Sequence, residues 1–382
     1  MPELKFIMWA SAFLVFYPYF GYIAALRAFS LVKRRDEPGT GGFEPRVTLL
    51  ISAHNEEKTI KEKILNSLAL DYPEDKLEIV LVSDGSKDRT LEIAGKYPDR
   101  ITIRHYAERA GKTMCLNRAV PLAEGEIVVF SDANSCYEKN AVKLLVENFR
   151  DPSIGFVTGR TRYMTEDGGG FQESIGFYAR IERLTKALES GTGSCVGADG
   201  AIFAIRKSLF KPLLASDIND LVIPLQVIRA GYSGVLEPRA YCEEGTSGSR
   251  KGEFNRQVRI SARTLGAILR NRDLMNPLRH GLFSFKLVSH KLLRMLSPFF
   301  MLSLFAANIL LVQEGPLYSA LLLLQCAFYL SAVAGSVGSR PNPLSRVFAV
   351  SYAFAAVNAA ILYAWLKFLK GESFVTWSPT RR

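Results

Sequence analysis

The sequence has few cysteines, and none of them forms the short pairs that bind zinc or carry out redox chemistry. Its 382 residues include five widely scattered cysteines, Cys115, Cys136, Cys195, Cys242 and Cys326. The chain contains no Cys-x-x-Cys pair, so neither a zinc site nor a thiol–disulfide redox motif is expected. Reduced thiols in a domain that faces the cytosol are the simple interpretation.

Two further absences exclude other classes of protein. A dinucleotide-binding oxidoreductase needs a G-x-G-x-x-G motif after its first strand, but residues 53–58 read AHNEEK. The net charge is +11, yet the chain has no clustered stripe of basic and aromatic residues, so no nucleic-acid partner is expected. The positive charge instead suits an anionic membrane surface and phosphate-bearing substrates.

Apolar residues are concentrated at the two ends of the chain. Residues 6–32 are long enough to span a bilayer and are followed by the basic run Lys33-Arg34-Arg35. This order predicts an uncleaved transmembrane anchor, residues 1–32, with the next domain in the cytoplasm. Residues 33–45 have the composition of a linker. The prediction is therefore a multi-pass protein of the cell (inner) membrane, in contact with membrane lipids.

A second apolar region follows the middle of the chain. Residues 282–295 carry Lys286, Lys291 and Arg294 among apolar residues, which is typical of an interfacial amphipathic helix. Residues 296–370 contain about three membrane-length segments, and residues 371–382 form a basic tail. Four crossings would place this tail outside, whereas its charge favours the inside. One segment could therefore be interfacial or re-entrant, and the sequence does not show which.

Residues 46–275 alternate between apolar strands and amphipathic helices. Predicted strands at 46–52, 77–82, 101–106 and 127–130 are separated by helical segments. This alternation predicts an α/β fold with a doubly wound, mostly parallel sheet and helices on both faces. Right-handed crossovers place the polar strand ends on one rim, where open α/β folds bind ligands.

Asp132-Ala133-Asn134 follows the fourth predicted strand and puts two oxygen-bearing side chains two residues apart. Such oxygens can converge on one hard cation, and Mg²⁺ and Mn²⁺ prefer them. Turn-forming Asp and Asn at a strand end are the structural alternative. Polar residues at the ends of two other strands, His54 to Glu56 and Asp84, favour a ligand-binding rim.

Five segments, in this order, resemble glycosyltransferase family 2: VTLLISAHNEE, LALDYP, LEIVLVSDGSKDRT, RAGKTMCLNRA and EIVVFSDAN. The resemblance covers roughly residues 45–270 and is nearest to the membrane-bound, cellulose-synthase-like branch. It implies the GT-A fold and an inverting hexosyl transfer from a nucleotide-diphosphate sugar, with a UDP-sugar favoured. It also implies Mg²⁺ or Mn²⁺ as cofactor.

The resemblance assigns residues to the donor and metal sites. Ala53, Glu56 and Asp84 match the positions that hold the base and ribose, and His54 belongs to the same donor site. Carboxylates suit ring N–H and hydroxyl donors. Lys112 matches a residue that faces the diphosphate as a point charge. Asp132 matches the metal ligand of the family's DxD motif, and the second metal position is Asn134, which keeps an oxygen but loses a charge.

Catalysis requires a base that takes the proton of the attacking acceptor hydroxyl. In this branch of the family the base is the aspartate of a TED motif, which matches Asp220 in Ile218-Asn219-Asp220. Asn219 replaces the glutamate. A structural role is also open, because Asp220 could cap the following helix.

Two motifs match the acceptor side of the family. Asp199 and Gly200 fall in its acceptor-site loop, where Asp199 could contact acceptor hydroxyls or be solvated. The QxxRW motif falls at 256–260, where Arg259 is kept and Arg256 and Ile260 replace Gln and Trp. That Trp stacks on the acceptor sugar in processive synthases, so its absence puts processivity in doubt. Arg256 and Arg259 could bind diphosphate or face anionic lipid.

The sequence thus predicts a membrane-anchored glycosyltransferase of polysaccharide or glycolipid synthesis, acting on a saccharide or lipid-linked acceptor. Single transfer to a polyprenyl-phosphate carrier is an alternative that the few membrane segments and the missing Trp favour. A non-catalytic membrane regulator that binds sugar nucleotides is an alternative of another class. The presence of both Asp132 and Asp220 disfavours it.

Overall fold

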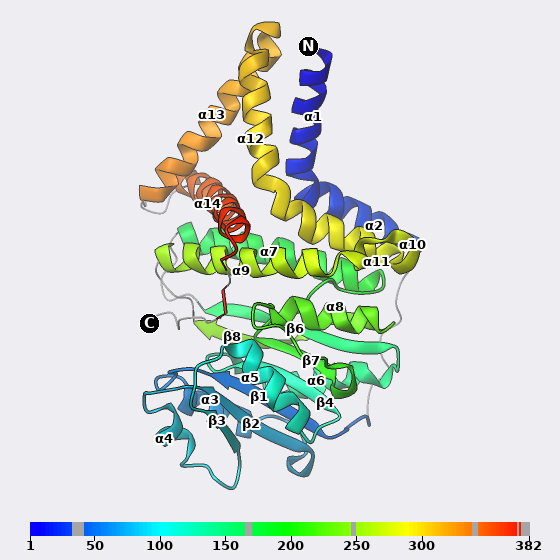
Figure 1. Cartoon of the computed structure of the whole chain (residues 1–382), viewed down its shortest axis with the longest axis vertical. Helices are drawn as coiled ribbons and strands as arrows, with labels where there is room; N and C mark the ends of the chain where they lie inside the picture. Colours follow the sequence, from blue (N-terminus) through cyan, green and yellow to red (C-terminus); the bar gives the residue numbers. More distant parts are fainter. Residues whose placement is uncertain (33–41, 165–169, 246–249, 338–342, 373, 376–382) are drawn as a thin grey trace.

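The computed structural model describes residues 1–32, 42–164, 170–245, 250–337, 343–372 and 374–375. An α/β domain lies below a group of long apolar helices (Figure 1). Several features of the sequence lie outside the described residues: most of the predicted linker with its basic run at 33–35, the glycines at 168–169, the residues at 338–342, and the tail from 376.

An eight-stranded mixed sheet forms the centre of the α/β domain, in the order β3-β2-β1-β4-β7-β6-β8-β5. The first four strands in this order are parallel, as predicted. β7 is antiparallel to both β4 and β6, and β5 is antiparallel to β8, so the sheet is mixed. The strands are β1 (Val47–Ala53), β2 (Leu77–Asp84), β3 (Thr102–Tyr106), β4 (Ile127–Asp132), β5 (Cys136–Tyr137), β6 (Ile154–Met164), β7 (Ile202–Arg206) and β8 (Ser233–Gly245).

Helices cover both faces of this sheet, and the strand residues alternate between two hydrophobic cores. In β1, Leu49 and Ile51 point into one core, whereas Leu50 points into the other, as expected from the two-residue period of a strand. The helices of the domain are α3 (Ile60–Leu68), α4 (Thr90–Ala94), α5 (Lys112–Ala119), α6 (Ala141–Glu147), α7 (Gly170–Gly191), α8 (Asn219–Arg229) and α9 (Arg250–Arg270).

The described residues include four helical stretches that are long and apolar enough to cross a membrane. The first combines α1 (Pro2–Phe16) and α2 (Tyr22–Val32) through a π-helical turn that contains Pro18, a recognised cause of a kink. The others lie after the α/β domain, which is followed by α10 (Pro277–His280), α11 (Leu282–Leu287), α12 (Leu293–Leu311), α13 (Pro316–Val337) and α14 (Pro343–Leu369).

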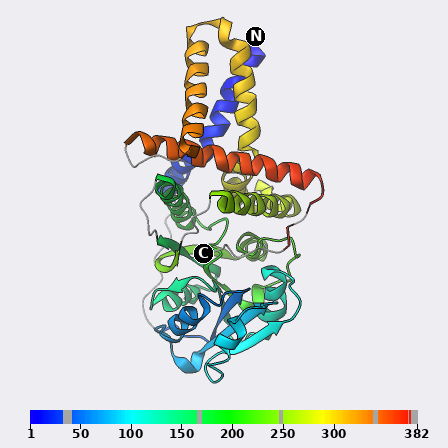
Figure 2. The same ribbon diagram turned by 90° about the vertical axis from the view of Figure 1, so that its left-hand side faces the viewer.

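These apolar helices have two orientations. α1, α12 and α13 extend away from the α/β domain (Figure 1), whereas α14 runs across their lower ends, over the α/β domain (Figure 2). α14 packs against both α9 and α7. α14 therefore lies along the surface of the α/β domain, at the lower ends of the other apolar helices.

The basic residues of 282–295 do not point where an interfacial helix would place them. Lys286 is 1% exposed and donates hydrogen bonds to the carbonyl oxygens of Glu189 and Ser194, at 2.8 and 3.1 Å. Arg294 is 5% exposed and donates to Glu182 Oε2 at 2.7 Å. These charges therefore join the segment to the α/β domain and do not face lipid headgroups.

Candidate active site

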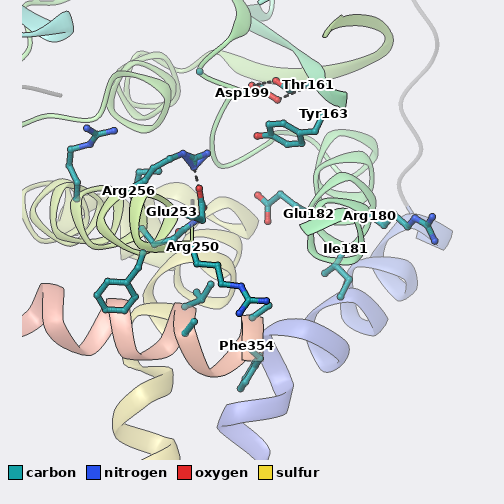
Figure 3. Close-up of a pocket in the computed structure, with 18 of the residues that line it drawn as sticks. Thr161, Tyr163, Arg180, Ile181, Glu182, Asp199, Arg250, Glu253, Arg256 and Phe354 are labelled. Atoms are coloured by element: carbon teal, nitrogen blue, oxygen red, sulfur yellow. Dashed lines mark hydrogen bonds and ion pairs between the residues drawn. The ribbon is translucent and has the colours of Figure 1, made fainter. Parts of the chain in front are cut away.

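A cavity of about 2440 Å³ lies between the carboxyl ends of the strands and the membrane helices. Its polar wall comes from residues after β1 and β4 and from α5, α7, α8 and α9, and its apolar wall from α1, α12, α13 and α14. In Figure 3, Asp199 and Tyr163 lie on the sheet side, Arg256 and Glu182 on the helices across from them, and Phe354 of α14 at the membrane side. One cavity thus joins the rim of the sheet to the apolar helices.

The predicted metal ligand, diphosphate lysine and base meet at one place in this cavity. Lys112, the first residue of α5, donates from Nζ to Asp132 Oδ1 at 2.5 Å and to the Gly200 carbonyl at 3.2 Å. A Cβ at Gly200 would lie 3.2 Å from Asp220 Oδ2, so glycine lets the Asp220 carboxylate approach the loop. Asp132, Lys112 and Asp220 therefore surround a common point.

Asp220 is in the first turn of α8, but it does not cap that helix. The residue at the N-cap is Ile218, and no side chain accepts a capping hydrogen bond there. Asp220 Oδ1 is buried and makes no hydrogen bond in the described part of the chain. Burial raises the pKa of the Asp220 carboxyl, although the ammonium groups of Lys112 and Lys186 oppose the rise. A buried carboxylate with an open acceptor atom can accept a proton.

The predicted nucleotide-binding residues divide into two groups. His54 and Glu56 line the cavity, whereas Ala53 and Asp84 do not. Asp84 is 1% exposed, and its carboxylate accepts hydrogen bonds from the backbone N–H groups of Ala110 and Gly111, at 2.7 and 2.9 Å. Asp84 thus fixes the loop that leads into Lys112.

Asp199, Gly200, Arg256 and Arg259, which the sequence assigns to the acceptor or the diphosphate, all line the cavity. The Asp199 carboxylate accepts hydrogen bonds from the backbone N–H and the hydroxyl of Thr161, both at 2.9 Å, so it holds the loop against β6 (Figure 3). Arg256 forms an ion pair with Glu253 at 3.7 Å. Burial and the neighbouring Arg263 and Arg256 lower the pKa of Arg259 to about 10.

A second group of arginines lines the same cavity from β6 and α7, namely Arg160, Arg180 and Arg183. Arg160 Nε is buried and makes no hydrogen bond in the residues that the structure describes. Burial and the nearby Arg162 and Arg183 lower the pKa of Arg160. Because crowded guanidinium groups repel one another, this wall favours a bound anion.

Residues 243–252, EEGTSGSRKG, have the composition of a mobile loop, so Glu244 is not among the site residues predicted from the sequence. The structure places 243–245 at the end of β8 and 250–252 at the start of α9. Glu244 lines the cavity, and burial and the nearby Asp132 carboxylate raise its pKa to about 7. The two-residue period from the buried Ala240 and Cys242 was a signal that could have placed Glu244 on the same face.

Oxygen atoms at this site fit a hard divalent cation. Asp132 and Asn134 both line the cavity, and the Lys112 ammonium already lies against Asp132 Oδ1, so the position attracts positive charge. In the described ranges, no group of three or more His, Cys, Asp or Glu side chains could hold a metal. Mg²⁺ is often bound through one or two carboxylates together with substrate phosphates.

Residues 48–214 match the model of the family "Glycosyl transferase family 2". Poly-beta-1,6-N-acetyl-D-glucosamine synthases of Staphylococcus aureus (strain COL) and Staphylococcus epidermidis are 28% and 27% identical to the chain over 203 residues. Each match covers 51% of this chain and 49% of the relative, so the chain spans about half the length of these curated relatives.

A solved structure is similar over nearly the whole chain. It is the mannosyltransferase PcManGT from Pyrobaculum calidifontis in complex with GDP-Man and Mn²⁺, with a TM-score of 0.74 and 23% sequence identity. The match covers 97% of this chain and 100% of that protein, and it shows a shared GT-A fold, including the helices around the domain. Residues 48–214 therefore match glycosyltransferase family 2, and the similarity to the solved structure shows the fold.

Proposed function

We propose that the protein is a membrane-anchored, inverting glycosyltransferase that moves a hexosyl group from a nucleotide-diphosphate sugar to a lipid-linked acceptor. The observation that carries the proposal is the continuity of the cavity. It runs from Asp132 and Asp220 to apolar side chains of α1, α12, α13 and α14, such as Val15, Leu321 and Phe354.

The lining of the cavity favours a lipid-linked acceptor over a free saccharide. A soluble sugar gains little from apolar walls, whereas an acyl or prenyl chain that enters from the bilayer avoids the cost of about 0.8 kcal/mol for each CH₂ group that water would otherwise contact. Between the apolar wall and Asp220 the cavity is basic, with Arg160, Arg183 and Lys186 among its lining residues. A phosphate group that joins a lipid tail to the acceptor fits this order of apolar, basic and catalytic residues.

In the proposed reaction the attacking oxygen of the acceptor bonds to the anomeric carbon from the side opposite the diphosphate. The bond to the diphosphate breaks, and the nucleotide diphosphate leaves. Asp220 takes the proton of an attacking hydroxyl, and Lys112 lies beside the leaving phosphates. Asp132 and Asn134 would hold Mg²⁺ or Mn²⁺, which supplies positive charge against the leaving diphosphate.

The donor is a nucleotide-diphosphate sugar, with UDP-sugars expected from the sequence. The relatives are named for a polymer of N-acetyl-D-glucosamine, and the similar structure holds GDP-Man, so UDP- and GDP-sugars belong in one donor screen. We place the protein in the cell (inner) membrane as a multi-pass protein with its catalytic domain in the cytoplasm, where nucleotide sugars are made.

The acceptor proposal is tested by narrowing the apolar end of the cavity. Ala353 of α14 lines the cavity, and Ala359 of the same helix is exposed. We expect Ala353→Trp to reduce transfer to a saccharide joined to polyprenyl phosphate by about tenfold or more, because a displaced acceptor reacts slowly. Ala359→Trp should leave transfer unchanged, and both variants should bind the nucleotide normally. Full transfer by folded Ala353→Trp would contradict a lipid-linked acceptor in this cavity.

A further inference from the structure

We propose that Glu244 is a ligand of the divalent cation and supplies, from β8, the negative charge that Asn134 does not provide. The inference rests on the proposed function, because it assumes that the donor binds together with a metal ion. It differs from the sequence expectation, which gave Asp132 and Asn134 alone to the metal.

The pairing of strands brings Glu244 to the metal position. Asp132 ends β4, and its carbonyl oxygen accepts hydrogen bonds from the backbone N–H and the hydroxyl of Ser135, at 3.3 and 3.0 Å. This tight turn leads directly into β5, in which Cys136 lies opposite Glu243 of β8. The end of β8 is therefore hydrogen-bonded to the segment that carries Asp132 and Asn134.

Glu244 has an oxygen atom without a partner at this position. Its Oε1 atom is buried and makes no hydrogen bond in the described residues, although the side chain lines the same cavity as Asp132 and Asn134. A buried carboxylate oxygen without a partner costs free energy. A bound cation would remove this cost.

The two cationic side chains near Glu244, Lys63 and Arg256, do not take the position of a bound cation. Lys63 is 1% exposed, and its Nζ donates to the Ser135 carbonyl at 2.6 Å and lies 4.1 Å from the centre of the Tyr137 ring. Arg256 forms an ion pair with Glu253 at 3.7 Å. Lys63 thus holds the turn, and in the described residues neither Lys63 nor Arg256 donates a hydrogen bond to Glu244 Oε1.

The charge count of the site favours the same assignment. Two carboxylates that face one cavity repel each other, and a divalent cation between them converts the repulsion into attraction. Asp132 and Glu244 together carry the two negative charges of a DxD motif, while Asn134 adds a neutral oxygen. Oxygen ligands of this kind are those that Mg²⁺ and Mn²⁺ select.

The test measures metal binding by the purified full-length protein, with no turnover required. Mn²⁺ is titrated in the presence of UDP and, separately, GDP, and free Mn²⁺ is followed by electron paramagnetic resonance. We expect Glu244→Gln to weaken Mn²⁺ binding by about tenfold or more. The neighbouring Glu243 does not line the cavity, so Glu243→Gln should bind Mn²⁺ as the parent does.

A second variant separates a lost ligand from a damaged fold. Asn134→Asp added to Glu244→Gln restores the second charge at the DxD position, so it should recover most of the lost affinity. If Glu244→Gln bound Mn²⁺ as tightly as the parent, or if the folded double variant recovered no affinity, Glu244 would not be a metal ligand. The proposed function would not be affected by either result. A parent protein that binds both nucleotides equally well without Mn²⁺ would instead overturn the metal dependence of the proposed function, and this inference with it.

Discussion

The buried carboxylate of Asp220 is the residue on which the proposed chemistry depends most. Its Oδ1 atom has no hydrogen-bond partner in the described structure, and Gly200 leaves room beside Oδ2. A structural aspartate would use these oxygens to hold the backbone, as Asp84 does with Ala110 and Gly111. Asp220 is therefore available to take a proton, whereas Asp84 fixes the conformation of a loop.

Asp220→Asn should abolish transfer and leave donor binding nearly intact, because the amide keeps the shape but cannot take a proton. In the parent, burial raises the pKa of Asp220, and the base works only when deprotonated. The rate should therefore fall as the pH drops through this raised pKa, at a higher pH than for an ordinary aspartate near 3.9. Measured kcat against pH, with nucleotide binding by calorimetry, checks both effects. Substantial turnover by the variant would contradict the role of Asp220.

At the scale of residues, the order of the predicted strands places Asp132 on the rim of the sheet, and the family resemblance assigns Lys112 to the diphosphate and Asp220 to the base. The structure brings these three side chains together. Glu244 was missed because its position depends on the pairing of β8 with β5 and β6. That pairing joins segments about 100 residues apart in the sequence, where β8 also contains a bulge and Pro238, which weaken the strand pattern.

At the scale of elements, α7 joins the α/β domain to the membrane helices through two carboxylates, the buried Glu189 and the partly buried Glu182. Glu189 accepts a hydrogen bond from the Tyr22 hydroxyl of α2 at 2.7 Å and lies 2.7 Å from His290 Nδ1. Glu182 lies 3.1 Å from His290 Nε2 and accepts from Arg294. Two segments far apart in the sequence, α2 and the stretch from His290 to Arg294, thus meet at α7. The sequence could not show this, because each charge alone resembles a solvated residue.

Glu189→Ala should destabilise the folded protein by about 3–5 kcal/mol, since it leaves buried partners without their counter-charge. Burial opposes ionisation, but the contacts with His290, Tyr22 and the Val196 N–H hold the pKa of Glu189 below its usual value. Its contribution is therefore complete above the unfolded-state pKa and is lost as the pH falls through the folded-state pKa. Thermal unfolding in detergent at several pH values measures this.

A matched control is Glu92 in the first turn of α4, which forms an exposed ion pair with Arg89 at the N-cap of the same helix. Glu92→Ala should leave the unfolding temperature close to that of the parent, because solvent screens an exposed ion pair. If Glu189→Ala were as mild as Glu92→Ala, the network around α7 would not hold the membrane helices to the domain.

At the scale of the molecule, the orientation of α14 bears on how many times the chain crosses the membrane. Ala360 and Ala364 of α14 pack on Val258 and Ala262 of α9, and Phe374 joins this cluster. A Cβ at Gly111 would lie 2.5 Å from the Val375 carbonyl oxygen, so the chain after α14 lies against the α/β domain. We propose three crossings, by α1, α12 and α13, with α14 lying along the membrane surface.

This topology predicts the side of the C-terminus, which charge patterns in the sequence left undecided. A fluorescent reporter that folds only in the cytoplasm should be bright when fused after residue 382, because the C-terminus and the catalytic domain share one side. The same reporter inserted between α12 and α13, at residue 314, should be dark. A dark C-terminal fusion in a protein that still transfers sugar would show that α14 crosses the membrane.

The central claim is that this chain transfers sugar from a nucleotide donor to a lipid-linked acceptor in its cavity. The most direct measurement incubates the purified protein with Mn²⁺, radiolabelled UDP- or GDP-sugars and vesicles that contain a saccharide joined to polyprenyl phosphate, whose free hydroxyl groups can attack the donor, and then counts label in the organic phase. The account predicts label in the lipid fraction with at least one donor, and none with Asp220→Asn. Label found only in water-soluble oligosaccharide, or lipid labelling that persists in Asp220→Asn, would contradict it.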